Sequence, residues 1–196
     1  MKLTATALLL TAALAACSDK TDANKANFKE ALQTHFNAAP GVCITPPSQS
    51  VPFELDMKPW FTPPSGVTAI SRADALVEAG LLTRSENPAK KVFVYDLTAE
   101  GQKHLKPGAG SNRARGDAFC TGKTVIKEVT SFTAPADLLG YRVSEVTYTY
   151  NSEGMADWVK TPALEKVNRE RAARLRGDPG KHKAMLRLTS EGWVHD

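Results

Sequence analysis

Alternation of apolar and polar positions is the main pattern in the second half of the chain. Residues 141–150 alternate in this way, with Val146 and Tyr148 on the same face. A period of two is typical of a strand that buries one face. The β-branched, apolar segment 124–132 and the alternating segment 184–188 predict two further strands, so we expect an antiparallel sheet here.

A helical period appears in two other places. Phe28, Leu32 and Phe36 are spaced by four residues and define one apolar face, which ends before the Pro-Gly pair at 40–41. A second helix is predicted over residues 162–175, behind the antiparallel sheet, with a proline at its start.

The middle of the first half combines both periods. Ser71 and Asp74 resemble a capping box at the start of a helix. A two-stranded hairpin is predicted over residues 81–97 with its turn at 85–88, and Thr98 can cap a further short helix.

Within residues 71–105, the run ALVEAGLLTR and the later run YDLTAEG resemble the winged-helix fold of bacterial regulators. In that family the corresponding stretch contains the end of the recognition helix, the wing hairpin and the following helix. The presumed recognition helix carries Arg72 against Asp74 and Glu78, whereas a helix that reads a DNA groove needs donors for bases and phosphates. We therefore expect a reused scaffold and no nucleic-acid partner.

The segment from Thr45 to Pro64 carries six prolines, which excludes a long helix or a central strand. Aromatic residues such as Trp60 and Phe61 are interspersed, so we interpret the segment as ordered rather than as a bare linker. One short edge strand is predicted over residues 51–56.

The first sixteen residues have the pattern of an export signal. Lys2 is followed by an apolar run from Leu3 to Leu14 and then by small residues. A membrane-spanning helix needs roughly 20 apolar residues, so this run is too short to span a bilayer. The sequence therefore predicts a signal peptide over residues 1–16.

The residues Leu14-Ala15-Ala16-Cys17 resemble the lipobox of bacterial lipoproteins. The resemblance implies cleavage before Cys17, which becomes an N-terminus acylated with palmitate or related chains. The alternative is an ordinary secretory signal with an unrelated cysteine at the cut. In lipoproteins of Gram-negative bacteria an aspartate after the cysteine often signals inner-membrane retention, so Ser18 favours the outer membrane. The polar residues 17–27 are interpreted as a tether.

Composition adds the size and the charge distribution. The 196-residue chain has 42% apolar residues and a formal net charge of +4, values typical of a folded protein. Removal of residues 1–16 leaves enough chain for one large domain or two small ones. The positive charge is concentrated between Lys160 and Arg187, where nine Lys or Arg residues stand against three acids.

With Cys17 assigned to lipid, Cys43 and Cys120 remain as a pair. Disulfides persist in the oxidising compartments that exported chains reach, so we expect a Cys43–Cys120 disulfide. Two buried free thiols are the alternative. A redox site is not indicated, because neither cysteine belongs to a Cys-x-x-Cys pair.

No segment carries a recognised catalytic or cofactor motif. The histidines at 35, 104, 182 and 195 lack the spacing of a zinc site. Neither a Gly-x-Ser-x-Gly elbow nor a Gly-rich phosphate loop is present. We therefore expect no metal, no cofactor and no enzymatic activity. A pair of carboxylates that converge only in space is the arrangement that such motifs would miss.

Lys166, Arg169 and Arg176 fall in one sector of the predicted C-terminal helix. They form a candidate binding patch for an acidic protein, an anionic lipid or a cell-wall polymer. The alternative is a solvated face supported by Glu–Arg pairs four residues apart.

These patterns predict an α+β protein in which a winged-helix-like N-terminal part packs with an antiparallel β-sheet and one helix. The expected parts are a signal peptide (1–16), a tether (17–27), a winged-helix-like part (28–106), a loop (107–117) and an antiparallel sheet with a helix (118–196).

The expected function is that of a lipid-anchored envelope lipoprotein that faces the periplasm from the outer membrane. It would act as a non-catalytic binding or assembly module for an unknown envelope protein or anionic polymer. One alternative is an immunity or inhibitor lipoprotein against an envelope toxin or hydrolase. The other is a periplasmic hydrolase without a recognisable motif.

Overall fold

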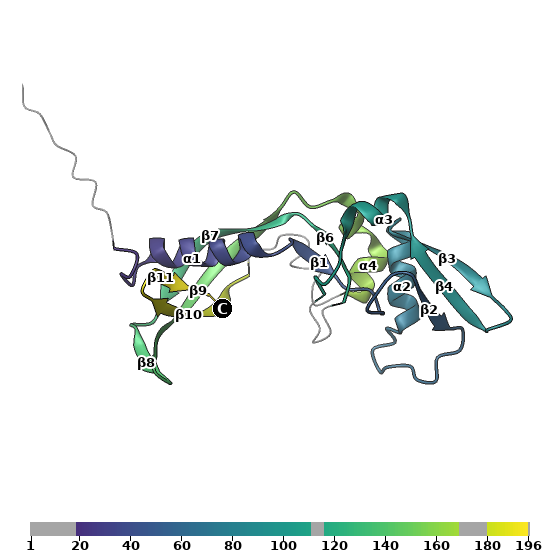
Figure 1. The fold of residues 1–196 in the computed structure, drawn as a ribbon, viewed down its shortest axis with the longest axis horizontal. Helices are drawn as coiled ribbons and strands as arrows, with labels where there is room; N and C mark the ends of the chain where they lie inside the picture. The colour runs from purple at the N-terminus through teal and green to yellow at the C-terminus, as the bar shows by residue number, and fades with distance from the viewer. Residues whose placement is uncertain (1–18, 111–115, 169–179, 196) are drawn as a thin grey trace, which may run out of the picture.

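The computed structural model of this protein describes residues 19–110, 116–168 and 180–195 (Figure 1). Its helices are α1 (Lys25–Ala38), α2 (Ala69–Glu78), α3 (Ala99–His104), α4 (Pro162–Val167) and the 3-10 helix η1 (Asp157–Lys160). Its strands are β1 (Val42–Ile44), β2 (Phe53–Asp56), β3 (Leu82–Asn87), β4 (Val92–Leu97), β5 (Leu105–Lys106), β6 (Ala118–Thr121), β7 (Lys123–Phe132), β8 (Ala136–Leu138), β9 (Tyr141–Glu153), β10 (His182–Thr189) and β11 (Gly192–Val194). Helices and antiparallel sheets together confirm the predicted α+β class.

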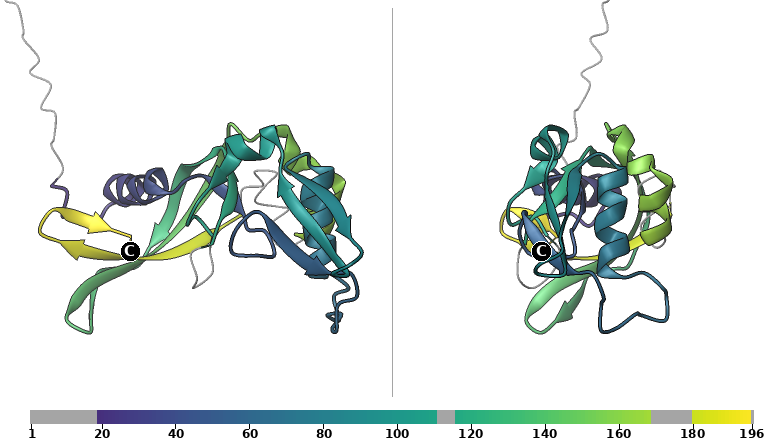
Figure 2. Two further views of the ribbon diagram at one scale, coloured as in Figure 1. Left: turned by 45° about the vertical axis from the view of Figure 1, so that its right-hand side comes forward. Right: turned by 90° about the vertical axis from the view of Figure 1, so that its right-hand side faces the viewer.

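The strands of the described ranges form three antiparallel sheets. The largest has the order β11-β10-β9-β7, with β8 also pairing with β9, and the other two have the orders β2-β4-β3 and β1-β6-β5. The molecule is long, with the β2-β4-β3 sheet at one end and the largest sheet at the other (Figures 1 and 2). The small sheet that contains β1 and β6 lies between these two ends.

Two separate clusters of buried side chains stabilise the two ends. The cluster that we call the α2 core includes Phe53, Leu76, Leu81, Tyr95, Phe119, Trp158 and Leu164. The cluster that we call the α1 core includes Phe28, Leu32, Ile126, Val146, Leu186 and Trp193. Each core therefore takes side chains from both the first and the second half of the chain.

This interleaving differs from the division predicted at residues 107–117. The helix α1 was expected in the first part, yet it packs on β7 and β11 of the largest sheet. The helix α4 was expected behind that sheet, yet it packs against α2. The alternation along β9 gives the largest sheet one apolar face that the strands themselves cannot bury. Phe28 and Leu32 of α1 pack on this face and cover it.

The helix α1 begins at a side-chain cap and ends where the sequence predicts. The side chain of Asn24 accepts a hydrogen bond from the backbone N–H of Asn27 at 2.9 Å, which satisfies one free donor of the first turn. Phe28 and Leu32 are fully buried, and the helix stops at Ala38. The predicted apolar face is therefore confirmed.

The same helix also protects the edge of β7. The Gln33 side chain donates to the carbonyl of Thr124 at 3.1 Å and accepts from the N–H of Ile126 at 2.9 Å. The register of β7 against β9 shifts between Ile126 and Glu128, which marks a bulge beside these contacts. One amide thus satisfies edge groups that would otherwise be open to pairing with another chain.

Of the predicted tether, the structure describes residues 19–27, and these pack on the folded body. The side-chain amide of Asn27, which is buried, donates to the carbonyls of Asp19 at 2.7 Å and Asp22 at 2.9 Å. The indole N–H of Trp193 donates to the Asp22 carbonyl at 3.1 Å. The polar composition of this segment predicts a linker. In the structure, the side chains of Asn27 and Trp193 instead hold its backbone on the folded body by donating hydrogen bonds to its carbonyl groups.

The predicted capping box at Ser71 is wrong by one turn. Thr68 begins α2, and its hydroxyl accepts from the Ser71 N–H at 3.0 Å. Asp74 instead accepts hydrogen bonds from the Tyr95 hydroxyl at 2.8 Å and from Arg84 at 2.9 Å. Burial, and then the hydrogen bond to Asp74, raise the pKa of Tyr95, so the phenol stays a neutral donor in the α2 core.

The helix, hairpin and helix that the sequence predicts between 71 and 105 are present as α2, β3–β4 and α3. The Thr98 hydroxyl caps α3 by accepting from the Gly101 N–H at 2.8 Å, as predicted. The hairpin turn lies after Asn87 rather than at 85–88, because β3 is longer than the apolar pattern indicates. The winged-helix resemblance itself stays a prediction.

In the second half the predicted strands are confirmed as β7, β9 and β10. The strand β9 continues to Glu153, past the turn predicted from Asn151. The helix predicted over residues 162–175 is described as α4 up to Val167, and its remaining residues lie outside the described part of the chain.

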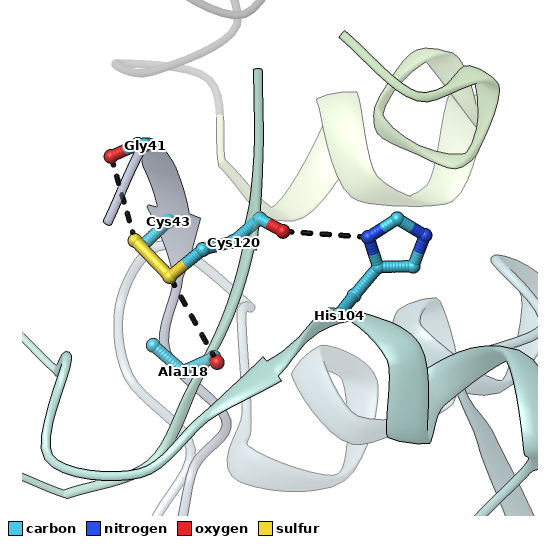
Figure 3. Close-up of a disulfide and its surroundings, with 5 residues drawn as sticks. All are labelled: Gly41, Cys43, His104, Ala118 and Cys120. Atoms are coloured by element: carbon cyan, nitrogen blue, oxygen red, sulfur yellow. Dashed lines mark hydrogen bonds between the residues drawn. A yellow bond between two sulfur atoms is a disulfide. The ribbon is translucent and has the colours of Figure 1, made fainter. Parts of the chain in front are cut away.

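A disulfide joins Cys43 and Cys120, as predicted (Figure 3). The two residues are direct partners on the antiparallel strands β1 and β6, with their Cα atoms 4.1 Å apart. Both strands lie where the chain passes between the two cores, so the covalent bond crosses the middle of the molecule.

Backbone segments approach each other closely beside this disulfide. Gly41 has φ +109° and Gly122 has φ +61°. A Cβ on Gly41 would lie 2.6 Å from the carbonyl oxygen of Gly122, and a Cβ on Gly122 would lie 2.6 Å from that of Glu153. Only glycine fits both the space and the backbone conformation at positions 41 and 122. We call the four residues Gly41, Cys43, Cys120 and Gly122 the junction.

The disulfide is expected to dominate the stability of the junction. The two cysteines are 77 residues apart, so removing the bridge in a Cys43→Ser, Cys120→Ser variant should lower the free energy of unfolding by about 4–5 kcal/mol in the chain-entropy model. Urea unfolding of the oxidised wild type and of the double variant measures the difference. Reduction of the wild type should reproduce the loss, and an unchanged midpoint would contradict it.

The Asp74 carboxylate is expected to stabilise the α2 core through the buried Tyr95 hydroxyl. In an Asp74→Ala variant that hydroxyl loses its acceptor, at a cost of roughly 1–3 kcal/mol in the free energy of unfolding. An Asp74→Asn variant keeps an acceptor oxygen and should recover most of the loss. Equal losses in the two variants, measured by urea unfolding, would show that the hydrogen bond is not the cause.

Candidate functional site

The residues predicted from sequence to carry function fall into two groups. The expected acylated residue Cys17 and the cations Arg169 and Arg176 lie outside the described residues. Lys166 lies on the exposed side of α4, in its last turn, while Leu164 of the same helix is buried against α2. The predicted basic patch is therefore described at one of its three positions.

Figure 3 shows a histidine beside the disulfide. The His104 ring has Nδ1 3.4 Å from the carbonyl oxygen of Cys120 and Nε2 3.0 Å from a carboxylate oxygen of Glu100. Hydrogen bonds from Lys103 and from His104 lower the pKa of Glu100. Both neighbours of the ring are acceptor oxygens. This arrangement links α3 to β6 and is structural.

A cavity of about 370 Å³ lies between the C-terminal end of α1 and the strands β9 and β10. Aromatic rings dominate its wall: the ring centroids of Tyr150 and His182 are 4.6 Å apart, and those of Phe36 and Tyr150 are 6.2 Å apart. Polar side chains such as Ser152 and Lys183 also line it, so the wall is mixed rather than apolar. Tyr150 and His182 have additional partners within the chain, so both rings also have a structural role.

The histidines do not converge on a metal site. His35 and His195 stack with ring centroids 4.2 Å apart, and Nδ1 of His35 lies 3.1 Å from the His195 carbonyl oxygen. Over the described ranges, no group of three or more His, Cys, Asp or Glu side chains could hold a metal ion.

One exposed aromatic pair stands out on the loop between β2 and α2. Trp60 is 94% exposed and Phe61 is 54% exposed, with their ring centroids 5.7 Å apart. The loop projects from the end of the molecule that contains the β2-β4-β3 sheet (Figure 1). No acid occurs from Met57 to Ala73, and the two charged residues in that stretch are Lys58 and Arg72. An apolar, acid-free loop of this kind is typical of a binding surface.

A second exposed apolar feature is the tip of the β8–β9 hairpin, at the other end of the molecule (Figure 1). We define the hairpin tip as residues 138–141. Leu138 is 50%, Leu139 91% and Tyr141 56% exposed. Leu138 and Tyr141 are register partners, so residues 139 and 140 alone make the turn.

The turn conformation at the hairpin tip does not suit its sequence. Leu139 has φ +49° and Gly140 has φ +81°. Two positive φ values are the mark of a type I′ turn, in which Asn-Gly is preferred. A non-glycine residue in this conformation costs about 1–2 kcal/mol. Leu139 is therefore unfavourable in the turn both for its backbone conformation and for its exposure.

Sequence reasoning identified neither exposed feature as a candidate site. The aromatic pair was visible as Trp60 and Phe61 among prolines, and their lack of a helical or strand period was the signal that they need not be buried. The hairpin tip had the weaker signal of two leucines before a glycine, because only the β8–β9 register shows that Leu139 occupies the turn.

None of the helices in the described part of the chain is both long and apolar enough to cross a bilayer. The chain matches no protein-family model, no curated protein and no solved structure. The two exposed apolar features and the aromatic cavity are therefore interpreted from their own geometry.

Proposed function

We propose that this protein is a lipid-anchored bacterial envelope lipoprotein that acts as a non-catalytic binding or assembly module. Its anchor is the acylated Cys17, and its address is the periplasmic face of the outer membrane. The occupant of its binding surface is an envelope protein.

The disulfide between Cys43 and Cys120 supports the proposed compartment. Such a bond persists outside the reducing cytosol. It agrees with the export signal and with the lipobox Leu14-Ala15-Ala16-Cys17. Two features, the disulfide of Cys43 with Cys120 and the leader that ends at Cys17, therefore favour an exported chain.

The exposed aromatic pair is the observation that carries the binding role. Trp60 and Phe61 lie on a loop at the end of the molecule opposite to residue 19, where the described chain begins (Figures 1 and 2). Aromatic residues are enriched at the centres of protein interfaces, where they supply much of the binding energy. An anchor at one end and an aromatic loop at the other suit a protein that presents its binding surface away from the bilayer.

The sequence of the loop indicates the chemistry of the partner. The stretch from Met57 to Ala73 carries the cations Lys58 and Arg72 and no acid, although Asp56 and Asp74 flank it directly. We therefore expect an apolar groove on the partner that receives the two aromatic rings, with Lys58 as the charge nearest to them in the sequence.

Acylation of Cys17 is tested by mass spectrometry of the protein purified from envelopes. The N-terminal peptide should begin at Cys17 and carry the mass of its acyl chains. A Cys17→Ser variant should lose both the cleavage and the added mass. A native peptide that begins elsewhere, or that carries a bare thiol at Cys17, would contradict the anchor.

The binding role is tested by co-purification from detergent-solubilised envelopes. A Trp60→Ser, Phe61→Ser variant should reduce recovery of a stoichiometric partner at least about tenfold, because hot-spot aromatics contribute 2 kcal/mol or more. Both residues are exposed, so the variant should unfold at the wild-type urea concentration.

A matched variant tests the basic patch predicted from sequence. If the aromatic loop carries the binding, Lys166→Glu, Arg169→Glu and Arg176→Glu together should leave recovery of the partner within about threefold of wild type, because none of these residues belongs to that loop. If the charge variant loses the partner and the aromatic variant recovers it fully, the aromatic loop is not the binding surface and the basic patch is.

A further inference from the structure

The hairpin tip combines three unfavourable properties in one place. Leu139 is almost fully exposed, adopts a backbone conformation that leucine rarely occupies, and is flanked by the half-exposed Leu138 and Tyr141. An Asn at position 139 would relieve the backbone conformation and the exposure together. Residues that are strained in the isolated fold occur where a ligand or surface supplies the compensation.

The position of the first docked residues restricts where the anchor can be. Asp19 and Asp22 are attached to the body through Asn27 and Trp193. The two residues from Cys17 to Asp19 span at most about 7 Å of extended chain. An acyl chain on Cys17 would therefore hold the folded body directly against the bilayer rather than on a flexible spacer.

The hairpin tip lies at that same end of the molecule. The described chain begins beside β11, and the hairpin of β8 and β9 extends from the same sheet (Figures 1 and 2). The loop with Trp60 and Phe61 lies at the opposite end. A body held by residue 19 thus has this hairpin at the anchored end, projecting on the side away from α1, and its aromatic loop at the far end (Figures 1 and 2).

We propose that the hairpin tip inserts into the lipid bilayer and acts as a second, non-covalent membrane contact beside the acylated Cys17. This inference rests on the proposed function, because the anchor supplies the bilayer. Leu138 and Leu139 enter the acyl region, where transfer of their side chains from water is favourable.

The residues around the two leucines suit the polar boundary of a bilayer. Tyr141 has an apolar ring and a hydroxyl, a combination that is enriched at membrane interfaces. The guanidinium of Arg187 lies 5.2 Å from the Tyr141 ring centroid. Arginine side chains in such positions keep their charge in the headgroup layer while their stems cover apolar surface.

The contact also explains the orientation that the proposed function requires. A single acyl attachment leaves the body free to rotate about the anchor. A second contact at the hairpin tip fixes the long axis, so that the aromatic loop points away from the bilayer. The hairpin tip is then a positioning element, and it takes no part in binding the envelope partner.

The test uses the acylated mature protein in vesicles of phosphatidylethanolamine and phosphatidylglycerol that contain no other protein. An environment-sensitive NBD fluorophore is attached to a cysteine introduced by Asp137→Cys, next to the hairpin tip. The other three cysteines are acylated or disulfide-bonded, so the new thiol is the reactive one. A matched Ser65→Cys label reports on the aromatic loop at the opposite end.

We expect the label at position 137 to shift to the blue and to become protected from iodide on reconstitution, while the label at position 65 stays accessible. Adding Leu139→Asn to the Asp137→Cys protein should abolish this shift and this protection. The same comparison is made in protein without the lipid anchor. There, Leu139→Asn should lower the partitioning into the vesicles about tenfold relative to the unanchored protein that keeps Leu139. Equal iodide access at positions 137 and 65 in the anchored protein would overturn the proposal.

The same substitution separates a membrane role from a folding defect. Asn suits the left-handed turn, so Leu139→Asn should raise the thermal midpoint by about 2–4 °C. A more stable protein that has lost its membrane contact cannot be explained by unfolding. Persistent protection of the label in the Leu139→Asn protein would overturn the proposal, because the leucine would then not be the inserted group.

Failure of the inference and failure of the proposed function give different results. If mass spectrometry finds no lipid on Cys17, the anchor is wrong, and the unanchored protein still tests insertion through its partitioning into vesicles. If the lipid is present and position 137 stays as accessible as position 65, the anchor holds and the inserted hairpin tip is wrong.

Discussion

The close crossing of backbone segments at the junction is the constraint on which the rest of the structure depends. The chain leaves α1 at Gly41 to build the α2 core, and it returns to the α1 core through Gly122. A side chain at either glycine would collide with a carbonyl oxygen of the neighbouring segment. The disulfide between Cys43 and Cys120 closes this crossing covalently. Neither core can form from one half of the chain, so the two ends are parts of one folding unit.

This crossing gives the molecule two ends with different chemistry. One end combines the first docked residues, the largest sheet and the hairpin tip, and the other carries the aromatic loop. Because the junction is backbone against backbone, the two ends are held at a defined separation. A long body of this kind suits a protein that is attached to one surface and presents a binding site to another.

The most exposed large apolar side chains of the described residues, Trp60 and Leu139, lie at the two extremities of the fold. Inside, the Gln33 amide serves the bulged edge of β7 and Asp74 accepts from the buried Tyr95, whereas the buried indole nitrogen of Trp158 has no hydrogen-bond partner among the described residues. Outside, Trp60 and Leu139 are exposed, and Leu139 occupies a turn conformation that it disfavours. A chain that is locally consistent except at a few exposed sites points to those sites as functional.

Much of the local structure could be predicted from the sequence, because local periods and caps determine it. The face of α1 with Phe28 and Leu32, the alternation along β9, the Thr98 cap of α3 and the α+β class all follow from patterns within about fifteen residues. The pairing of Cys43 with Cys120 followed from counting cysteines in an exported chain. The lipidated residue Cys17 remains an expectation from sequence alone.

The tertiary structure decided what long-range packing controls. In the structure α1 packs on the largest sheet and α4 packs on α2. The reason is that the crossing at the junction decides which apolar surfaces come to lie next to each other. The tertiary structure turned the polar residues 19–27 into a docked segment, since Asn27 and Trp193 are the donors for their carbonyls. It also brought Leu139 to the turn, which depends on strand register. A sequence shows which residues are apolar, but only the fold shows which of them are left uncovered.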